Sequence, residues 1–342
     1  MYTDADLDDA VRRDILQSDA VIAFRRYIEQ KRGVRGADEE HVRFLSSFND
    51  VFVVIACGLF LGTGLWVILD RAGLFVGGLF LAGAAWGLAE VFTRRRRMAL
   101  PSIVLLGAFV CGVTLCVTME TLGDFEPLAI LVAGGCAAAI HWLRFRVPIT
   151  PAVGAGFGVA CFIFLLGRYT QLLEVYSTVI ALSAGVVVFL WAMRWDISDT
   201  QRQTRRSDVA FWLHLLAAPL LVHPVFSVLV ADDGHVGFLQ GGAIFAAYGA
   251  LAIVSLLIDR RALMVSALGY VIFALYNLFE QNNVTTSFAA TCAVVGAALI
   301  FLSIFWGRAR TLFLQFFPAS FSLRLPPSSP HLHDEGIKKE AA

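Results

Sequence analysis

Apolar residues fill most of the chain after Val51, in ten stretches that short polar breaks separate. Each stretch is close to the roughly 20 residues that an α-helix needs to cross about 30 Å of hydrocarbon. The pattern therefore predicts an all-α protein, a polytopic transmembrane helical bundle of about ten spanning helices. The predicted spans are residues 51–69, 72–92, 99–119, 127–143, 149–167, 173–193, 210–230, 237–257, 262–279 and 286–306.

Two polar segments flank the apolar stretches and complete the predicted domain organisation. Residues 1–50 carry apolar residues at helical spacing, such as Leu7, Val11 and Ile15, which predicts a small cytoplasmic helical headpiece. Residues 307–342 contain a Pro- and Ser-rich run followed by polar residues, which predicts a mostly disordered cytoplasmic tail. The ten-helix bundle occupies residues 51–306 between them.

The positions of the basic residues predict the orientation in the membrane. Of 27 Lys and Arg residues, all but Arg71 and Arg168 fall in the headpiece, in the tail or in every second break. Cytoplasmic loops are rich in Lys and Arg, so both termini are predicted to be cytoplasmic. The remaining breaks are acidic or neutral. Their acidic residues are Glu120, Asp124, Glu126, Glu174, Asp232, Asp233 and Glu280.

Composition agrees with a chain surrounded by a lipid bilayer. Hydrophobic residues make up 58% of the 342 residues and charged residues only 16%, against about 25% charged in soluble domains. The mean hydropathy is +0.72. The formal net charge is zero, so nucleic acid is not an expected partner. The six cysteines lie in apolar stretches without a CxxC pair, which argues against a disulfide framework or a zinc ribbon.

Polar residues inside the later spans are the best candidates for a functional site. Proline cannot donate a backbone hydrogen bond, so the seventh span is expected to kink or open at Pro219 and Pro224. Broken helices line cavities in many transporters, although hydrogen bonds between helices explain such polar residues equally well. The candidate polar cavity consists of His214, Pro219, His223, Pro224, Tyr248, Tyr270 and Asn277.

Two histidines are candidate ligands for a haem or a metal ion. His141 and His214 are predicted to lie at similar depth, where facing imidazoles can bind either group. Buried histidines more commonly bond a neighbouring helix, so no metal and no cofactor is expected.

Other chemistry is sparse along the spans. Glu90 lies four residues before Arg94, which predicts an ion pair at a helix end. No Asp, Glu, Lys or Arg lies near the middle of a span, which counts against carboxylate-driven proton transport. The chain has no GxSxG or HExxH motif, so no catalytic residue is assigned and no enzyme activity is expected.

Three GxxxG pairs indicate close helix packing, because small residues let helix backbones approach. They are Gly58 with Gly62, Gly83 with Gly87 and Gly154 with Gly158.

Two stretches resemble those of known proteins: residues 45–52, with the sequence LSSFNDVF, and the region from Arg205 through Phe211-Trp212-Leu213-His214 to Pro224. They resemble an uncharacterised family of bacterial polytopic inner-membrane proteins, in which a short cytoplasmic helical headpiece precedes a multi-helix bundle. The resemblance implies a bacterial inner membrane and implies no particular activity.

These observations leave three functions open. The first is a membrane scaffold or sensor that does not transport, with the headpiece binding a protein partner. The second is a small neutral-solute transporter. Its layout resembles the drug/metabolite transporter superfamily, whose sequence pattern the chain lacks, and an inverted five-plus-five repeat would favour it. The third, remote, function is a haem- or metal-binding membrane protein. The sequence identifies no substrate.

Reporter fusions test the predicted topology. Alkaline phosphatase is expected to be active after Gly123 and Gly234, and green fluorescent protein after Arg97, because the first two lie in acidic or neutral breaks and the third in a basic one. Reversed signals would overturn the predicted orientation.

Overall fold

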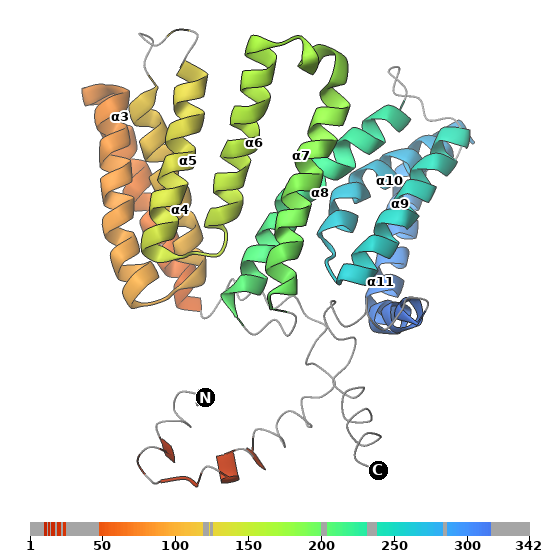
Figure 1. Ribbon diagram of the computed structural model, residues 1–342, viewed down its shortest axis with the longest axis horizontal. Coiled ribbons are helices and arrows are strands. Elements are labelled where there is room, and N and C mark those ends of the chain that lie inside the picture. The colour runs from red at the N-terminus through yellow and green to blue at the C-terminus, as the bar shows by residue number, and fades with distance from the viewer. Residues whose placement is uncertain are drawn as a thin grey trace.

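A computed structural model describes residues 48–118, 123, 126–199, 204–230, 238–282 and 286–315, together with residues 10, 11, 13, 15–17, 19–21, 23 and 24. Most of the predicted headpiece and the predicted tail after residue 315 lie outside the described residues. Within them, nine long helices are apolar enough to cross a membrane, and they stand side by side (Figure 1). The helices are α3 (Phe48–Ala89), α4 (Ala99–Val117), α5 (Glu126–Phe145), α6 (Thr150–Tyr169), α7 (Leu172–Ile197), α8 (Arg205–Leu229), α9 (Phe238–Ile258), α10 (Ala262–Gln281) and α11 (Ser287–Leu314), and a π-helix, η1 (Glu90–Arg95), follows α3.

The first helix, α3, consists of two antiparallel halves. Gly73, near the predicted break at Asp70 and Arg71, has a φ of 81° and a ψ of 179°, a conformation almost confined to glycine. The chain reverses direction at Gly73, as the ring contact between Phe60 and Phe80 shows: their centroids lie 6.1 Å apart. Twenty residues of straight helix would separate them by about 30 Å. Each of the ten predicted apolar stretches therefore has a counterpart in a described helix, with α3 accounting for two of them.

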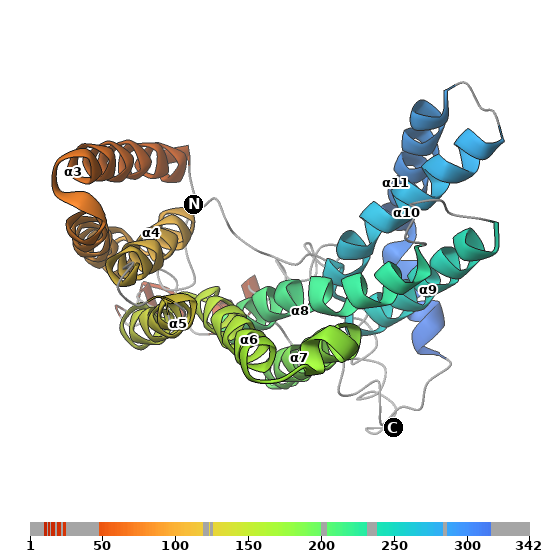
Figure 2. The same ribbon diagram turned by 90° about the horizontal axis from the view of Figure 1, so that it is seen from above.

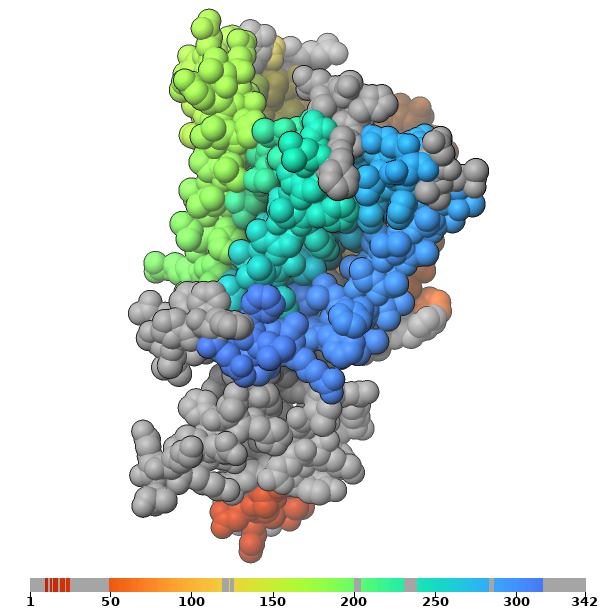
Figure 3. All heavy atoms as spheres, turned by 90° about the vertical axis from the view of Figure 1, so that its right-hand side faces the viewer, coloured from red at the N-terminus to blue at the C-terminus, as the bar shows by residue number. Residues whose placement is uncertain are grey.

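The helices form a curved row, with α3 at one end and α11 at the other (Figure 2). Near the middle of the row, α8 packs against α6, α7, α9 and α10. In its most apolar stretch 50% of the residues are buried, the largest share among the nine helices. At the far end, α9 and α11 lie against each other (Figure 3). The buried core is therefore divided into clusters between neighbouring helices.

Alternate connections lie at the same end of the helices. Figure 1 shows η1 with the start of α4 along its lower edge, together with the ends of α5, α7 and α9 and the starts of α6, α8 and α10. These are the breaks that hold most of the predicted cytoplasmic arginines, among them Arg97, Arg146, Arg205 and Arg260. We refer to this edge as the basic end. The predicted alternation of basic breaks is present in the fold.

Small residues bring α3 and α4 into close contact. A Cβ at Gly112 would lie 2.4 Å from the backbone nitrogen of Ala82, and a Cβ at Gly78 would lie 2.7 Å from the carbonyl oxygen of Gly112. The two backbones approach this closely because no larger side chain stands between them. The contact thus depends on Gly78, Ala82 and Gly112.

Two of the three GxxxG pairs do not pack as the sequence predicted. A Cβ at Gly58, Gly62, Gly83 or Gly87 would meet nothing within 4 Å. In the third pair, a Cβ at Gly154 would make an ordinary contact of 3.7 Å with the Cβ of Ala138. The GxxxG spacing identifies small residues in the sequence, but the rotation of each helix about its axis decides which of them face a neighbouring helix.

Replacing Gly112 by Ala is expected to destabilise the protein by about 1–3 kcal/mol, because the new methyl group overlaps the backbone of α3. The matched control is Gly107→Ala on the same helix, where an added Cβ meets nothing within 4 Å. That change is expected to be neutral or stabilising by up to about 1 kcal/mol. Thermal unfolding of the detergent-solubilised protein measures both, and equal effects would contradict the contact.

Candidate functional site

A buried ion pair joins α7 to the α9–α10 connection at the basic end. Arg260 donates from Nη2 to Oδ1 of Asp196 at 2.6 Å and from Nε to Oδ2 at 3.1 Å. The guanidinium also donates to the carbonyl oxygen of Ser207 at 3.2 Å and to its hydroxyl at 3.3 Å. Arg260 is 2% exposed and Asp196 is 4% exposed. A two-pronged pair of this kind fixes distance and direction together.

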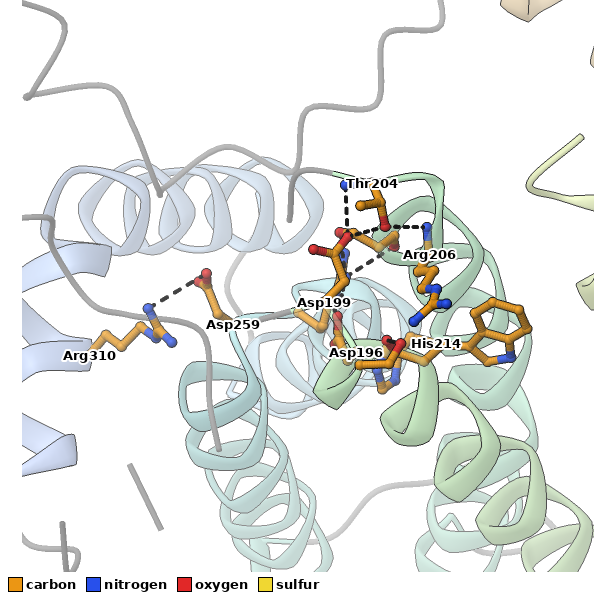
Figure 4. A network of polar contacts seen from close by, with 11 residues as sticks. Asp196, Asp199, Thr204, Arg206, His214, Asp259 and Arg310 are labelled. Carbon is orange, nitrogen blue, oxygen red and sulfur yellow. Dashed lines mark hydrogen bonds and ion pairs between the residues drawn. The ribbon is translucent and has the colours of Figure 1, made fainter. Parts of the chain in front are cut away.

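His214 completes this cluster from α8. Its Nε2 lies 3.3 Å from Oδ2 of Asp196, and Figure 4 shows the two side chains next to each other. The imidazole ring stands edge-on to Phe189, with the ring centroids 5.2 Å apart. We define the ion-pair cluster as Asp196, Ser207, His214 and Arg260. It connects α7, α8 and the α9–α10 connection.

A second buried ion pair lies beside the first and ties α11 to α9. Asp259 accepts a hydrogen bond from Nε1 of Trp306 at 2.9 Å, and Nη1 of Arg310 lies 3.7 Å from its Oδ2 (Figure 4). Arg310 also donates from Nε to the carbonyl oxygen of Leu256 at 3.2 Å. The guanidinium of Arg261 lies 4.7 Å from the centre of the Trp306 ring.

The sequence alone does not identify these buried charges: it places Arg260 in a cytoplasmic break and Arg310 in the cytoplasmic tail. The signal that could have found them is the short break at Asp259-Arg260-Arg261. Two helices joined by so few residues leave little room for these side chains to reach solvent. α11 also continues to Leu314 rather than ending at 306, and this extension carries Arg310 to Asp259.

The structure separates the members of the predicted polar cavity. His223 and Tyr270 do meet: Nδ1 of His223 and the hydroxyl of Tyr270 are hydrogen-bonded. Both line a cavity of about 480 Å³ together with Ser227 and Ser266. His214 belongs instead to the ion-pair cluster.

The other two polar candidates lie elsewhere. Tyr248 lines a separate cavity of about 190 Å³ that also contains Arg261 and Trp306. Asn277 donates to the carbonyl oxygen of Phe273 on its own helix, at 2.9 Å. The predicted residues therefore do not form one continuous cavity.

The two prolines do not open α8, contrary to one of the predicted alternatives. The helix is continuous from Arg205 to Leu229 with Pro219 and Pro224 inside it. Pro224 removes the usual donor to the carbonyl of Leu220. α7 approaches there: a Cβ at Gly185 would lie 3.0 Å from the carbonyl oxygen of Leu220. The freed carbonyl therefore faces a glycine on the neighbouring helix.

The two candidate ligand histidines lie in different clusters. His141 packs among the rings of Trp86, Phe109 and Phe145, contributed by α3, α4 and α5, whereas His214 faces Phe189 on α7. No ring contact between the histidines occurs in the described part of the chain. Among those residues, no group of three or more His, Cys, Asp or Glu side chains is arranged to hold a metal ion. The predicted pair at Glu90 and Arg94 is confirmed, with 3.2 Å between Oε2 and Nη1.

Comparison with known protein families, with curated proteins and with solved structures finds no match to this chain.

Replacing Asp196 by Asn is expected to destabilise the protein by about 3–5 kcal/mol, because the Arg260 guanidinium then stays buried without a counter-charge. Asp70→Asn, at an exposed carboxylate, should stay within about 0.5 kcal/mol of the parent protein. Adding Arg260→Gln to Asp196→Asn should cost less than the sum of the single changes, since the two partners act as a unit. Unfolding measured in detergent tests all four variants, and additivity would contradict the pair.

Proposed function

We propose that this chain is a multi-pass protein of a bacterial inner membrane that works as a scaffold or sensor and does not transport solute. In this proposal the chain crosses the membrane ten times and keeps both termini in the cytoplasm. The headpiece binds a protein partner and is the working end. Lipid surrounds the curved row of helices.

The main support for this proposal is that the buried charged side chains pair with one another. Asp196 and Arg260, and Asp259 and Arg310, satisfy one another at one end of the helices. Transporters that move ions keep ionisable side chains near the middle of the membrane, facing a cavity. The ion pairs here instead hold α7, α8, α9, α10 and α11 in a fixed arrangement, as a scaffold requires.

The packing of the two halves also supports this proposal. In the first half, the extensive contacts join neighbours along the chain: α3 with α4, α4 with α5 and α5 with α6. In the second half, α8 also packs against α10, and α9 against α11. An inverted five-plus-five repeat would pack its halves alike. The two halves of this chain pack differently.

The cavity at His223 and Tyr270 favours the alternative, a small neutral-solute transporter. Its volume of about 480 Å³ suits a small molecule, and Ser227 and Ser266 add hydroxyl groups to its lining. A transport path must open to each side of the membrane in turn. Access to this cavity therefore distinguishes the two functions.

Gly269 offers a site for this measurement, because it lines the cavity and a Cβ there meets nothing within 4 Å. In a variant without the six native cysteines, Gly269→Cys is expected to react with a membrane-impermeant thiol reagent from at most one side. Thr170→Cys and Arg96→Cys, both exposed positions in opposite types of break, serve as outside and inside controls. Reaction of Gly269→Cys from both sides would reject the proposal and favour transport.

A further inference from the structure

A third cavity, lined by charged and polar residues, lies at the basic end, among the starts of α4, α6 and α8. Its volume is about 310 Å³, at the lower end of the roughly 300–1,000 Å³ typical of small-molecule sites. Three arginines line it, each from a different element: Arg97 precedes α4, Arg146 precedes α6 and Arg205 begins α8. The cavity is distinct from the ion-pair cluster.

The charge of this cavity is positive. No described carboxylate forms an ion pair with Arg97, Arg146 or Arg205. Asp208 is the acidic residue in the lining. Three guanidinium groups therefore outweigh one carboxylate even when Asp208 is ionised.

Helix dipoles add to this positive charge. α4, α6 and α8 have at least 19 residues each, and all begin at the cavity. At Met98 and Ile149, the residues before α4 and α6, no side chain caps the helix. Helix N-termini with free backbone N–H groups attract anions.

An unsatisfied hydroxyl inside the cavity is the independent sign of a ligand. Thr93 lines the cavity and is 9% exposed, and its Oγ1 has no hydrogen-bond partner among the described residues. Leaving a buried hydroxyl unpaired is costly, and native structures seldom do so without a reason. The neighbouring Ser102 differs, because its hydroxyl donates to the carbonyl of Met98.

Thr93 also belongs to η1, the π-helix that follows α3. Single π-helical turns are rare and occur frequently at functional sites. The widened turn is visible in the hydrogen bond from the backbone nitrogen of Arg96 to the carbonyl oxygen of Val91, at 3.0 Å.

From these observations we propose that this cavity binds a phosphate group, held by Arg97, Arg146 and Arg205 and accepting a hydrogen bond from the hydroxyl of Thr93. The group belongs either to an anionic phospholipid headgroup or to a soluble phosphate compound. Basic pockets between membrane helices bind anionic headgroups, and arginine pairs well with phosphate oxygens. This inference goes beyond the proposed function, and its test does not depend on whether the protein transports solute.

The test uses the purified full-length protein, delipidated in a neutral detergent. The probes are phosphatidylglycerol, phosphatidylcholine, sodium phosphate and glycerol 3-phosphate. Native mass spectrometry measures bound lipid, and the shift in Tm measures all four probes. The wild type is expected to retain one phosphatidylglycerol, or to gain Tm with one of the soluble phosphates. Protection by phosphatidylglycerol alone identifies a lipid site, and protection by the soluble phosphates identifies a soluble ligand.

Two triple variants separate a built site from general surface charge. Replacing Arg97, Arg146 and Arg205 by Gln is expected to weaken binding at least about tenfold, because each loses a charge-assisted hydrogen bond to the phosphate. Replacing Arg96, Arg194 and Arg206 by Gln removes the same charge from exposed positions at the same end, outside this lining, and should leave binding nearly unchanged. Equal loss in both variants, or no binding of any probe by the wild type, would overturn the proposal.

Thr93→Val keeps the shape of the side chain and removes its hydroxyl, so it tests the site with little risk to folding. Without a probe, its Tm is expected to equal or exceed that of the wild type, because a buried unpaired hydroxyl has been removed. With the probe that protects the wild type, the gain in Tm should be smaller. A variant whose gain in Tm matches the wild type would show that Thr93 does not bind the ligand.

Discussion

The pairing of Asp196 with Arg260 is the interaction on which the arrangement of the second half depends. The guanidinium of a buried arginine cannot shed its proton, so the fold must supply a counter-charge within hydrogen-bonding distance. Asp196 supplies it from the end of α7, and both oxygens of its carboxylate take part. Apolar packing alone discriminates weakly among helix arrangements in lipid, because lipid tails are as apolar as leucine. The pair therefore specifies how α7 and α8 meet the α9–α10 connection.

α8 connects this cluster to the cavity lined by Arg97, Arg146 and Arg205, which we call the cationic cavity. Its first turn directs Ser207 towards Arg260, while Arg205 and Asp208 line the cavity. The two sites thus share one helix N-terminus. Both sites are therefore contiguous along α8, the helix with the largest buried share among those described.

The fold was largely predictable from the sequence, whereas the sites were not. The number and length of the helices were predictable because a helix that crosses a bilayer needs about 20 apolar residues. Each of the ten predicted stretches has a counterpart in a described helix. Helix rotation is a different matter. Gly58 and Gly62 have the spacing of a packing motif but face open space, while Gly112, outside any such motif, touches α3. The packing of neighbouring helices decides which glycines are in contact, and the spacing of glycines along one helix does not reveal that packing.

The same limit explains why the charged sites were missed. An arginine in a basic break predicts a side of the membrane, and the prediction is the same whether its side chain is solvated or buried. Arg260 and Arg96 therefore look alike in the sequence, although one is buried in an ion pair and the other is exposed. His214 was selected because it stood inside an apolar stretch. Its partner Asp196 was not selected, because it lies just beyond the end of one.

The same unusual backbone conformation occurs at the second ion pair and at the cationic cavity. Among the described residues, Arg97, Arg146 and Asp259 are the non-glycine residues with positive φ, at 53°, 51° and 55°. Each follows a helix at the basic end, where glycine is the residue that fits without strain. Keeping a side chain there costs about 1–3 kcal/mol, and each of these side chains has a use: Asp259 binds Trp306, and the two arginines line the cavity. The strain is thus confined to positions where glycine would remove a charge from one of the two sites.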